Sequence, residues 1–247
     1  MAGIAIFTRQ TERSIRMQTH LQLELLTPND IEAVLKLRSL IYLPLGTIEW
    51  HGQHLPVGFD GLCAQRLCLL AAQQTGGLVM PPLYFGTGGG HGAFPWTIMP
   101  PAEQIEPLLE TTLRRLCDFG AKQVVLYSGH FPEVQLELIQ SLAQMFSIST
   151  FRVDVLAPSL AKDSLPIAVD HAARFETALM LGIAPEHVFW QNLPSVDAAP
   201  DVLETRMSDV KHPLYGVSGP DPRVMPATLP QELGEAMLKW IVARVNS

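Results

Sequence analysis

The stretch QVVLYSGHFPEVQLELIQSLAQMF, residues 123–146, decides the fold class, because it joins a strand pattern directly to a helix pattern. Residues 123–127 are mostly apolar and include two β-branched side chains, which predicts a buried strand. Farther along, apolar side chains recur at helical spacing, namely Val134, Leu138, Ile139, Leu142 and Phe146. This spacing predicts a helix over 133–147. A strand followed by a helix is the repeating unit of a parallel sheet covered by helices.

The same alternation continues on both sides of this stretch. Short apolar runs with strand character lie at 40–43, 78–80 and 151–155. Helical spacing and capping residues predict helices near 28–38, 62–73, 102–119, 171–183 and 230–244. We therefore expect an α/β protein with three layers, α/β/α, around a mostly parallel central sheet. In such folds, ligand sites lie beyond the carboxyl ends of the strands.

The sequence indicates one domain, because no repeat, low-complexity tract or long polar linker marks a boundary. We expect residues 1–20 to be an N-terminal extension, with order or disorder left open, and residues 21–247 to form the single domain. The extension does not have the layout of a signal peptide, since its arginines follow its apolar stretch. A weak transit peptide is the lesser alternative, and Met1 and Met17 both stay open as the start.

The amino-acid composition limits which kinds of partner the protein is expected to bind. The 247 residues are 47% hydrophobic and carry 17 Lys and Arg against 24 Asp and Glu, for a net charge of -7. No segment concentrates the basic residues, so nucleic acid is not an expected partner. Prolines and charges interrupt every apolar run before the roughly 18 to 20 residues that a membrane span needs. A membrane is therefore not an expected partner either. Three cysteines without a CxxC pair indicate reduced thiols and a cytoplasmic location.

A polar cluster follows the first predicted strand in the sequence LGTIEWHGQHLPVGFD, residues 45–60. Glu49 and His51 are two residues apart, so both side chains project from one face of an extended segment. Asp60 can fold back toward them through glycine turns. An imidazole with two carboxylates suits Zn²⁺, Mn²⁺ or Fe²⁺, and a bridging aspartate would let two ions sit about 3.5 to 4 Å apart. On spacing alone, an ordinary polar loop is the alternative.

Two later clusters carry further polar side chains. His130 comes directly after the strand of the opening stretch, level with the first cluster if the two strands are neighbours. Its alternative role is to cap the following helix. Asp170, His171 and Glu176 stand at the start of a later predicted helix, and helical geometry does not place all three on one face. A turn near Ala172 must therefore aim them separately, and an N-cap role is the alternative for Asp170.

His91 lies in a segment with four glycines in five residues, Gly88 to Gly92. Glycines let the backbone approach a ligand closely, which favours a mobile substrate loop. The chain contains neither a phosphate-binding GxxxxGKS/T pattern nor a GxSxG nucleophile pattern. Catalysis by a serine or cysteine nucleophile therefore lacks local support.

Taken together, these segments resemble the creatininase (creatinine amidohydrolase) family. The first cluster carries most of the resemblance, through the pattern Leu43-Pro44-x-Gly46-x-x-Glu49-x-His51-Gly52-x-His54-Leu55-Pro56-x-Gly58-x-Asp60. The later segments follow in the same order, as His91-x-x-Phe94-Pro95-x-Thr97, Gly129-His130, His171-x-x-x-x-Glu176-Thr177 and Gly216-Val217-x-Gly219.

The resemblance implies a layered α/β/α hydrolase with a two-metal centre that cleaves a carbon–nitrogen bond in a cyclic amide, amidine or formamide. The implied ligands of the two ions, Zn, Mn or Fe, are Glu49, His51, Asp60 and His130, with Asp60 bridging. Such ions activate a water molecule. His171, oriented by Asp170, is the expected proton donor to the leaving nitrogen, and His91 is a further catalytic candidate. We expect a small-molecule substrate and a homo-oligomer, since family members are commonly hexameric.

The segment around His130 departs from the family pattern. Many members have Asn-Gly-His-Gly-Gly-Asn, whereas this chain has Ser128-Gly129-His130-Phe131-Pro132-Glu133. Creatininase has a metal-binding glutamate two residues after the histidine, where Pro132 stands here. Glu176 or Glu133 would have to supply the missing ligand, and we favour Glu176 because the pattern around it is otherwise intact. Phe131 and Pro132 make the expected pocket more apolar and rigid, which disfavours creatinine as the substrate.

Two alternative functions stay open within this resemblance. One is a deformylase or peptidase of the family that serves cofactor biosynthesis, for which a peptide substrate would require an open groove. The other is a catalytically impaired member that keeps the fold in a structural role. The altered segment around His130 is the main support for the second alternative.

Overall fold

The computed structural model describes residues 21–247, and the N-terminal extension expected at residues 1–20 lies outside the described residues. The predicted α/β fold is confirmed, because strands alternate with helices and every strand pair in the sheet is parallel. Across residues 21–247, no helix combines the length and the apolar character that crossing a bilayer demands.

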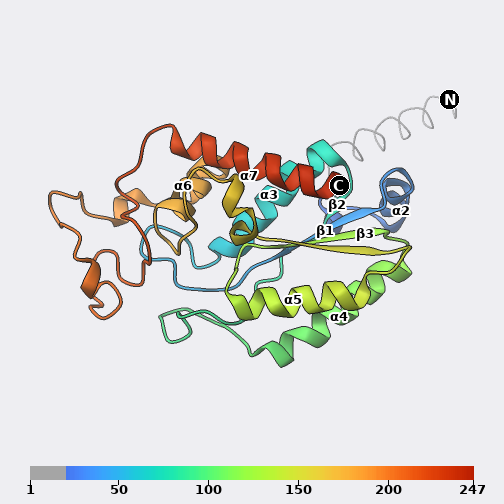
Figure 1. The fold of residues 1–247 in the computed structure, drawn as a ribbon, viewed down its shortest axis with the longest axis horizontal. Coiled ribbons are helices and arrows are strands. Elements are labelled where there is room, and N and C mark those ends of the chain that lie inside the picture. Colours follow the sequence, from blue (N-terminus) through green and yellow to red (C-terminus); the bar gives the residue numbers. More distant parts are fainter. Residues whose placement is uncertain (1–20) are drawn as a thin grey trace, which may run out of the picture.

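The described residues form four strands and six α-helices (Figure 1). The strands are β1 (Leu40–Leu45), β2 (Leu78–Val79), β3 (Gln123–Ser128) and β4 (Arg152–Leu156). The α-helices are α2 (Pro28–Leu37), α3 (Phe59–Thr75), α4 (Ala102–Asp118), α5 (Glu133–Phe146), α6 (Arg174–Ile183) and α7 (Leu229–Asn246). Short 3₁₀ helices lie at Leu23–Leu25, Pro158–Ser164, Pro185–His187, Trp190–Asn192 and Leu203–Thr205. The elements lie within a few residues of their predicted positions.

The strand order is β2-β1-β3-β4, which places β1 and β3 side by side in the centre of the sheet. Leu45 at the end of β1 pairs with Ser128 at the end of β3. The chain segments that leave these two strands therefore start level with each other. The sequence predicted that His130 lies level with the first polar cluster if these two strands are neighbours. The two strands are neighbours, so this condition is met.

Helices cover both faces of the sheet, with α3, α6 and α7 above it and α4 and α5 below it in Figure 1. Successive side chains of a strand point to opposite faces. Tyr42 and Tyr127 accordingly enter the core shared with α3, α6 and α7. Leu43 and Leu126 enter the core shared with α4 and α5. The three layers that the sequence predicted are therefore present.

The first turn of α3 packs directly on the ends of β1 and β3. Gly46 and Gly129 permit this approach, because a Cβ atom on Gly46 would clash with the backbone of Gly61, and one on Gly129 would clash with the backbone of Asp60. No other residue type fits at either position without a backbone shift. The two glycines thus bring Asp60, in the first turn of α3, into the space between the segments that follow β1 and β3.

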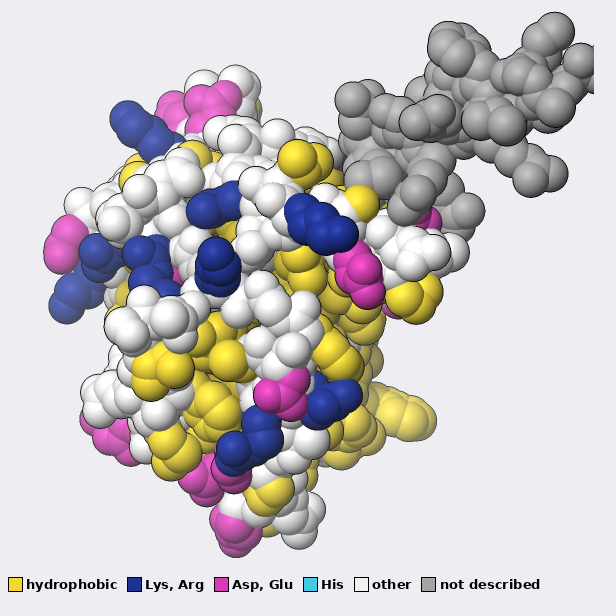
Figure 2. All heavy atoms as spheres, turned by 90° about the vertical axis from the view of Figure 1, so that its right-hand side faces the viewer, with side chains coloured by type: hydrophobic (Ala, Val, Ile, Leu, Met, Phe, Trp, Pro, Cys, Tyr) yellow, Lys and Arg dark blue, Asp and Glu magenta, His cyan; other side chains and the backbone are white. Residues whose placement is uncertain are grey.

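The opposite end of the sheet has a different surface. Figure 2 shows the end at the right of Figure 1, where α2 leads into β1 and the strands begin. On this face Lys and Arg side chains are interspersed with Asp and Glu and with hydrophobic side chains, and no histidine is in view (Figure 2). The histidine clusters belong to the carboxyl end of the strands.

Candidate metal centre

The five side chains that the sequence singled out as metal ligands come together at the carboxyl ends of β1 and β3. Each has a relative exposure of 4% or less, and they are Glu49, His51, Asp60, His130 and Glu176. Buried carboxylates and imidazoles in this number require partners, because an unpaired buried charge is costly. The contacts among these five side chains therefore decide what the site can hold.

Asp60 stands at the centre of the group, with one carboxylate oxygen toward each histidine. Its Oδ1 atom lies 3.1 Å from His51 Nε2, and its Oδ2 atom lies 3.2 Å from His130 Nδ1. A carboxylate that presents its two oxygens to two separate sets of partners has the geometry of a bridge. The bridging role that the family resemblance implies for Asp60 stays a prediction, with which this geometry is compatible.

Two further carboxylates complete the surroundings of the two histidines. Glu49 Oε2 lies 2.9 Å from His130 Nδ1, and Glu176 Oε2 lies 3.6 Å from His51 Nε2. The first ligand group is Glu49, Asp60 and His130, and the second ligand group is His51, Asp60 and Glu176. Within each group, one ligand atom per residue lies within 4.8 Å of the others. Glu133, the alternative that the sequence left open, is exposed on the first turn of α5.

Backbone carbonyl groups orient both imidazole rings. His51 Nδ1 lies 3.0 Å from the carbonyl oxygen of Glu49, and His130 Nε2 lies 3.2 Å from that of Thr87 and 3.3 Å from that of Gly88. Because a carbonyl only accepts, these nitrogens carry protons, and the opposite nitrogen of each ring faces the carboxylates. Fixing the tautomer through the outer nitrogen is the usual arrangement for a metal-binding histidine. Part of the glycine-rich segment thus serves to orient His130.

Several atoms at the centre of the cluster have no hydrogen-bond partner among the described residues, although they are fully buried. They are Glu49 Oε2, His51 Nε2 and Asp60 Oδ2. All three are ligand atoms of the two groups defined above. A divalent cation would satisfy such atoms, and a set of nitrogen and carboxylate donors suits zinc, manganese or iron. The residues present therefore fit a two-metal centre.

The electrostatics of the cluster favour positive charge. Burial alone would lower the pKa of His51 and of His130, but the nearby carboxylates, Asp60 foremost, raise both values to about 10. Burial would raise the pKa of Glu49, but the adjacent imidazoles of His130 and His91 lower it to about 2. Protons on the two imidazoles thus balance the carboxylates when no cation is bound. Metal binding displaces such protons, because only the deprotonated ligand atom can coordinate.

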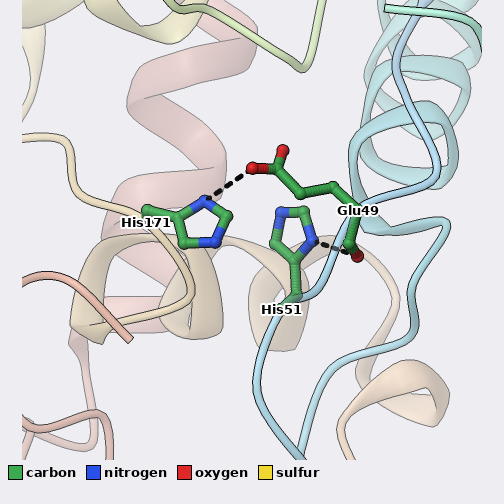
Figure 3. A group of neighbouring side chains, drawn as sticks. All are labelled: Glu49, His51 and His171. Carbon is green, nitrogen blue, oxygen red and sulfur yellow. Dashed lines mark hydrogen bonds and ion pairs between the residues drawn. The ribbon is translucent and has the colours of Figure 1, made fainter. Parts of the chain in front are cut away.

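His171 lies at the edge of this cluster, facing Glu49 (Figure 3). Its Nδ1 atom is 3.9 Å from Glu49 Oε1, and its Nε2 atom is 2.9 Å from the carbonyl oxygen of Trp50. Burial, reinforced by His51, lowers the pKa of His171 to about 3, so the ring is neutral near pH 7. Glu49, His51 and His171 also form a third group with metal-ligand spacing, which leaves two roles open for His171.

His91 contacts the same carboxylate oxygen of Glu49 as His171 does. Its Nδ1 atom lies 3.2 Å from Glu49 Oε1, and its Nε2 atom lies 2.9 Å from the carbonyl oxygen of Gly216. Its ring stacks on that of His171, with the ring centroids 3.9 Å apart. The glycine-rich segment therefore places His91 against Glu49, and a catalytic role for His91 stays a prediction.

The expectation that Asp170 orients His171 is not met. The Asp170 carboxylate accepts hydrogen bonds from the backbone N–H groups of Phe175, at 2.8 Å, and Glu176, at 3.3 Å. It caps α6, which begins at Arg174 rather than near residue 171, because Ala172 has the left-handed φ of 53°. The turn expected at Ala172 is thus present, but the N-cap position belongs to Ala173, and Asp170 accepts the N–H bonds of the first turn from three residues before it. His171 is oriented by the Trp50 carbonyl group instead, a contact that a sequence pattern does not reveal.

A cavity of ≈ 800 Å³ opens beside the cluster. Glu49, Asp60, His91, His130, His171 and Glu176 all line it. Phe131 and Pro132 are part of its wall, as the sequence suggested, together with Ile167, Val169 and Met207 from later segments. Arg174 also lines the cavity, although nothing in the sequence set it apart from an ordinary helix residue. The only feature of the sequence that could have identified Arg174 as a site residue was its position between His171 and Glu176.

Comparisons with known proteins identify similar sequences that cover most of the chain. The family model for creatininase, described as creatinine amidohydrolase, matches residues 24–246. Creatinine amidohydrolase from Pseudomonas putida is 28% identical over 233 residues, which are 82% of this chain and 85% of that protein. Mycofactocin precursor peptide peptidase from Mycolicibacterium smegmatis is 27% identical over 167 residues, which are 65% of this chain and 64% of that protein.

The fold is also that of solved structures. A mutant creatininase of the Zn–Zn type superposes with a TM-score of 0.73 at 23% identity, covering 92% of this chain and 98% of that one. The family model spans nearly all of the described residues, including every side chain of the two ligand groups. The chain therefore belongs to the creatininase family of hydrolases.

Proposed function

We propose that this chain is a two-metal hydrolase that cleaves a carbon–nitrogen bond in an amide, amidine or formamide. The single observation that carries the proposal is the placement of Asp60, whose two oxygens face His51 and His130 on opposite sides. Glu176 and Glu49 complete the two ligand groups around it. The solved relative of the Zn–Zn type supports a site for two ions, and the relatives named for creatinine and for a precursor peptide support the class of bond.

The first ligand group would hold one ion and the second ligand group the other. When bound, a pair of divalent ions supplies Lewis acidity toward a carbonyl oxygen and lowers the pKa of water to near 7. Glu49, Asp60 and Glu176 balance the charge of such a pair, and burial excludes competing solvent from their ligand atoms. The backbone bonds of His51 and His130 keep each ring in the orientation that presents its free nitrogen.

His171 is placed to move the proton that the reaction requires. Its Nε2–H group donates to the Trp50 carbonyl group, so the unprotonated Nδ1 atom faces Glu49 and the cavity. In the proposed reaction, the oxygen of water forms a bond to the carbonyl carbon, and its proton passes to His171 Nδ1. The carbon–nitrogen bond then breaks, and the same proton moves to the departing nitrogen. His91 holds Glu49 in place by its contact with Oε1.

Metal analysis tests the proposal most directly. The full chain, purified without chelator and supplied with Zn²⁺, Mn²⁺ or Fe²⁺, is expected to hold about two equivalents per chain, as the two ligand groups require. Elemental analysis by plasma mass spectrometry measures the content. A protein that holds no ion under any of these conditions would contradict the proposal and favour a structural role.

A substrate panel then addresses the reaction itself. Cyclic amides, formamides and short peptides are each assayed with the three metals, and release of a new amine and a new carboxylate is followed together. We expect turnover with at least one amide class and loss of turnover with a chelator. Assembly into a homo-oligomer and a cytoplasmic location stay predictions, to be tested by light scattering and by fractionation of cells.

A further inference from the structure

We propose that Arg174 binds a carboxylate group of the substrate, so that this hydrolase prefers amides that carry a negative charge close to the bond that is cleaved. The inference rests on the proposed function, because the cavity beside the two ligand groups is taken as the substrate site. It goes further by assigning a specificity-determining residue and a class of substrate.

Arg174 has a buried donor that is left without a partner. Its Nε atom is fully buried and has no hydrogen bond to any residue in 21–247, and no described carboxylate lies in ion-pair contact with its guanidinium group. A buried guanidinium donor without an acceptor costs free energy, so native structures normally provide one. The side chain lines the cavity, and of its three guanidinium nitrogens only Nε is fully buried without a partner, so a ligand in the cavity would accept from Nη1 and Nη2.

Arg174 also differs in charge from the rest of the cavity wall. Among the described residues that line the cavity, it is the only lysine or arginine, and the other ionisable side chains are carboxylates and histidines. The carboxylates of Glu49, Asp60 and Glu176 are directed at the ligand groups. Arg174 is therefore the one permanent cation that the chain itself offers to a ligand in this cavity. A planar guanidinium group is suited to bind a carboxylate through two parallel hydrogen bonds.

The nearest competing carboxylate, Asp170, is already engaged. Its oxygens accept from the N–H groups of Phe175 and Glu176 and cap α6. Arg174 lowers the pKa of Asp170 only as a minor influence, behind burial and the backbone hydrogen bonds. The guanidinium group thus stays available for an acceptor that comes from outside the chain.

The position of Arg174 limits where the substrate charge lies. Arg174 and Glu176 are two residues apart in the first turn of α6, which places their Cα atoms only about 5.5 Å apart. Side chains two residues apart on a helix do not face each other, so the link between the two is the cavity that both line: an anion held by Arg174 would share this cavity with the second ligand group. Among amides, this favours compounds whose carboxylate is one or two bonds from the amide nitrogen, such as ring amides with an attached carboxylate or N-acyl amino acids.

The wall of the cavity strengthens such a contact. Phe131, Pro132, Ile167 and Val169 line it alongside Arg174. Apolar surroundings exclude water and lower the local dielectric constant, so a charge-assisted hydrogen bond contributes more there than at an open surface. The same wall would exclude substrates with bulky polar groups.

Matched probe pairs test the inference by binding. The carboxylates 5-oxoproline and N-acetylglycine are compared with their neutral amides, 5-oxoprolinamide and N-acetylglycinamide, on the full chain loaded with Zn²⁺. Calorimetry is expected to show at least about tenfold tighter binding of each carboxylate, the size of a charge-assisted hydrogen bond. Arg174→Gln should remove this preference while leaving the metal content unchanged, and Arg174→Lys should retain part of it. Arg114→Gln, on the exposed face of α4, is the control for loss of a charge.

The outcomes separate this inference from the proposed function. Equal binding of both members of each pair, absence of carboxylate binding, or a preference that survives in Arg174→Gln would overturn the assignment of Arg174. If the wild-type chain holds none of Zn²⁺, Mn²⁺ and Fe²⁺, the proposed function fails, but the same probe pairs still report on Arg174 in the metal-free protein. For any carboxylated amide that is hydrolysed, Arg174→Gln should raise KM by about 10- to 100-fold and change kcat by only a few-fold.

Discussion

The two ligand groups that share Asp60 are built in different ways. The first, with Glu49 and His130, comes from segments that leave two paired neighbouring strands, and its contacts measure 2.9 and 3.2 Å. The second, with His51 and Glu176, needs a helix more than a hundred residues farther along the chain, and its contacts measure 3.1 and 3.6 Å. The sheet register therefore assembles the first group, whereas local structure at the start of α6 assembles the second.

Glu176 reaches the site through an unusual piece of backbone. Ala172 has a left-handed φ, which costs a residue with a side chain roughly 1 kcal/mol. The Glu176 carboxylate accepts a hydrogen bond from the N–H group of Ala172 at 2.6 Å, and Asp170 caps the same helix. The turn at Ala172 and the hydrogen bonds of Asp170 thus orient Glu176, which is far in sequence from the other members of the second ligand group. The second group should be the easier one to disrupt.

Removing the shared residue should have the largest effect. Asp60→Asn is expected to lower the metal content from about two equivalents to none and to abolish turnover, because both groups lose a charged ligand at once. Elemental analysis and activity assays measure the two effects, and circular dichroism checks the fold. Asp163→Asn, at an exposed position, should change neither. Retention of one tightly bound ion by Asp60→Asn would show that Asp60 does not bridge.

Disrupting the second group alone should cost one ion. Glu176→Gln is expected to retain about one equivalent and to lower kcat by about 100-fold or more, since a single metal contributes several kcal/mol to such reactions. Glu133→Gln is the matched control, because Glu133 is the exposed alternative on α5. A loss of metal in Glu133→Gln and not in Glu176→Gln would reverse this assignment.

The difference between the two groups explains what the sequence could predict. The strand and helix patterns predicted the sheet, and the local spacing of Glu49, His51 and Asp60 predicted that they share a site. His130 could be added because it follows the strand that pairs with β1. These inferences needed only periodicity and the rule that parallel strands end at one edge.

The rest depended on contacts that have no sequence signature. The carbonyl groups of Trp50, Thr87 and Gly88 orient His171 and His130 through backbone atoms, which any residue type provides. The partner of Asp170 was predicted wrongly, because adjacency in sequence suggested a contact that the turn at Ala172 prevents. The sequence did not identify Arg174 as a candidate site residue, because only the folded structure shows that it lines the cavity.

Replacing His171 should separate chemistry from metal binding. His171→Gln is expected to keep both ions and to lower kcat by about 10²- to 10⁴-fold, the usual contribution of a general acid–base group. Measuring metal content and kcat on the same sample distinguishes the two roles that the geometry leaves open. Loss of an ion in His171→Gln would identify the group of Glu49, His51 and His171 as a real coordination set.

The smallest expected effect concerns Asp170. Asp170→Ala removes the acceptor for two N–H groups of α6 and should lower the free energy of unfolding by about 1 kcal/mol, as for other helix caps. Thermal unfolding of Asp170→Ala and Asp170→Asn measures this, and asparagine should retain most of the stability because it also accepts hydrogen bonds. Since the carboxylate bonds to the backbone and not to His171, kcat should change far less than in His171→Gln. A loss of kcat as large as that of His171→Gln, in a folded protein with both ions bound, would restore the role of Asp170 in orienting the histidine.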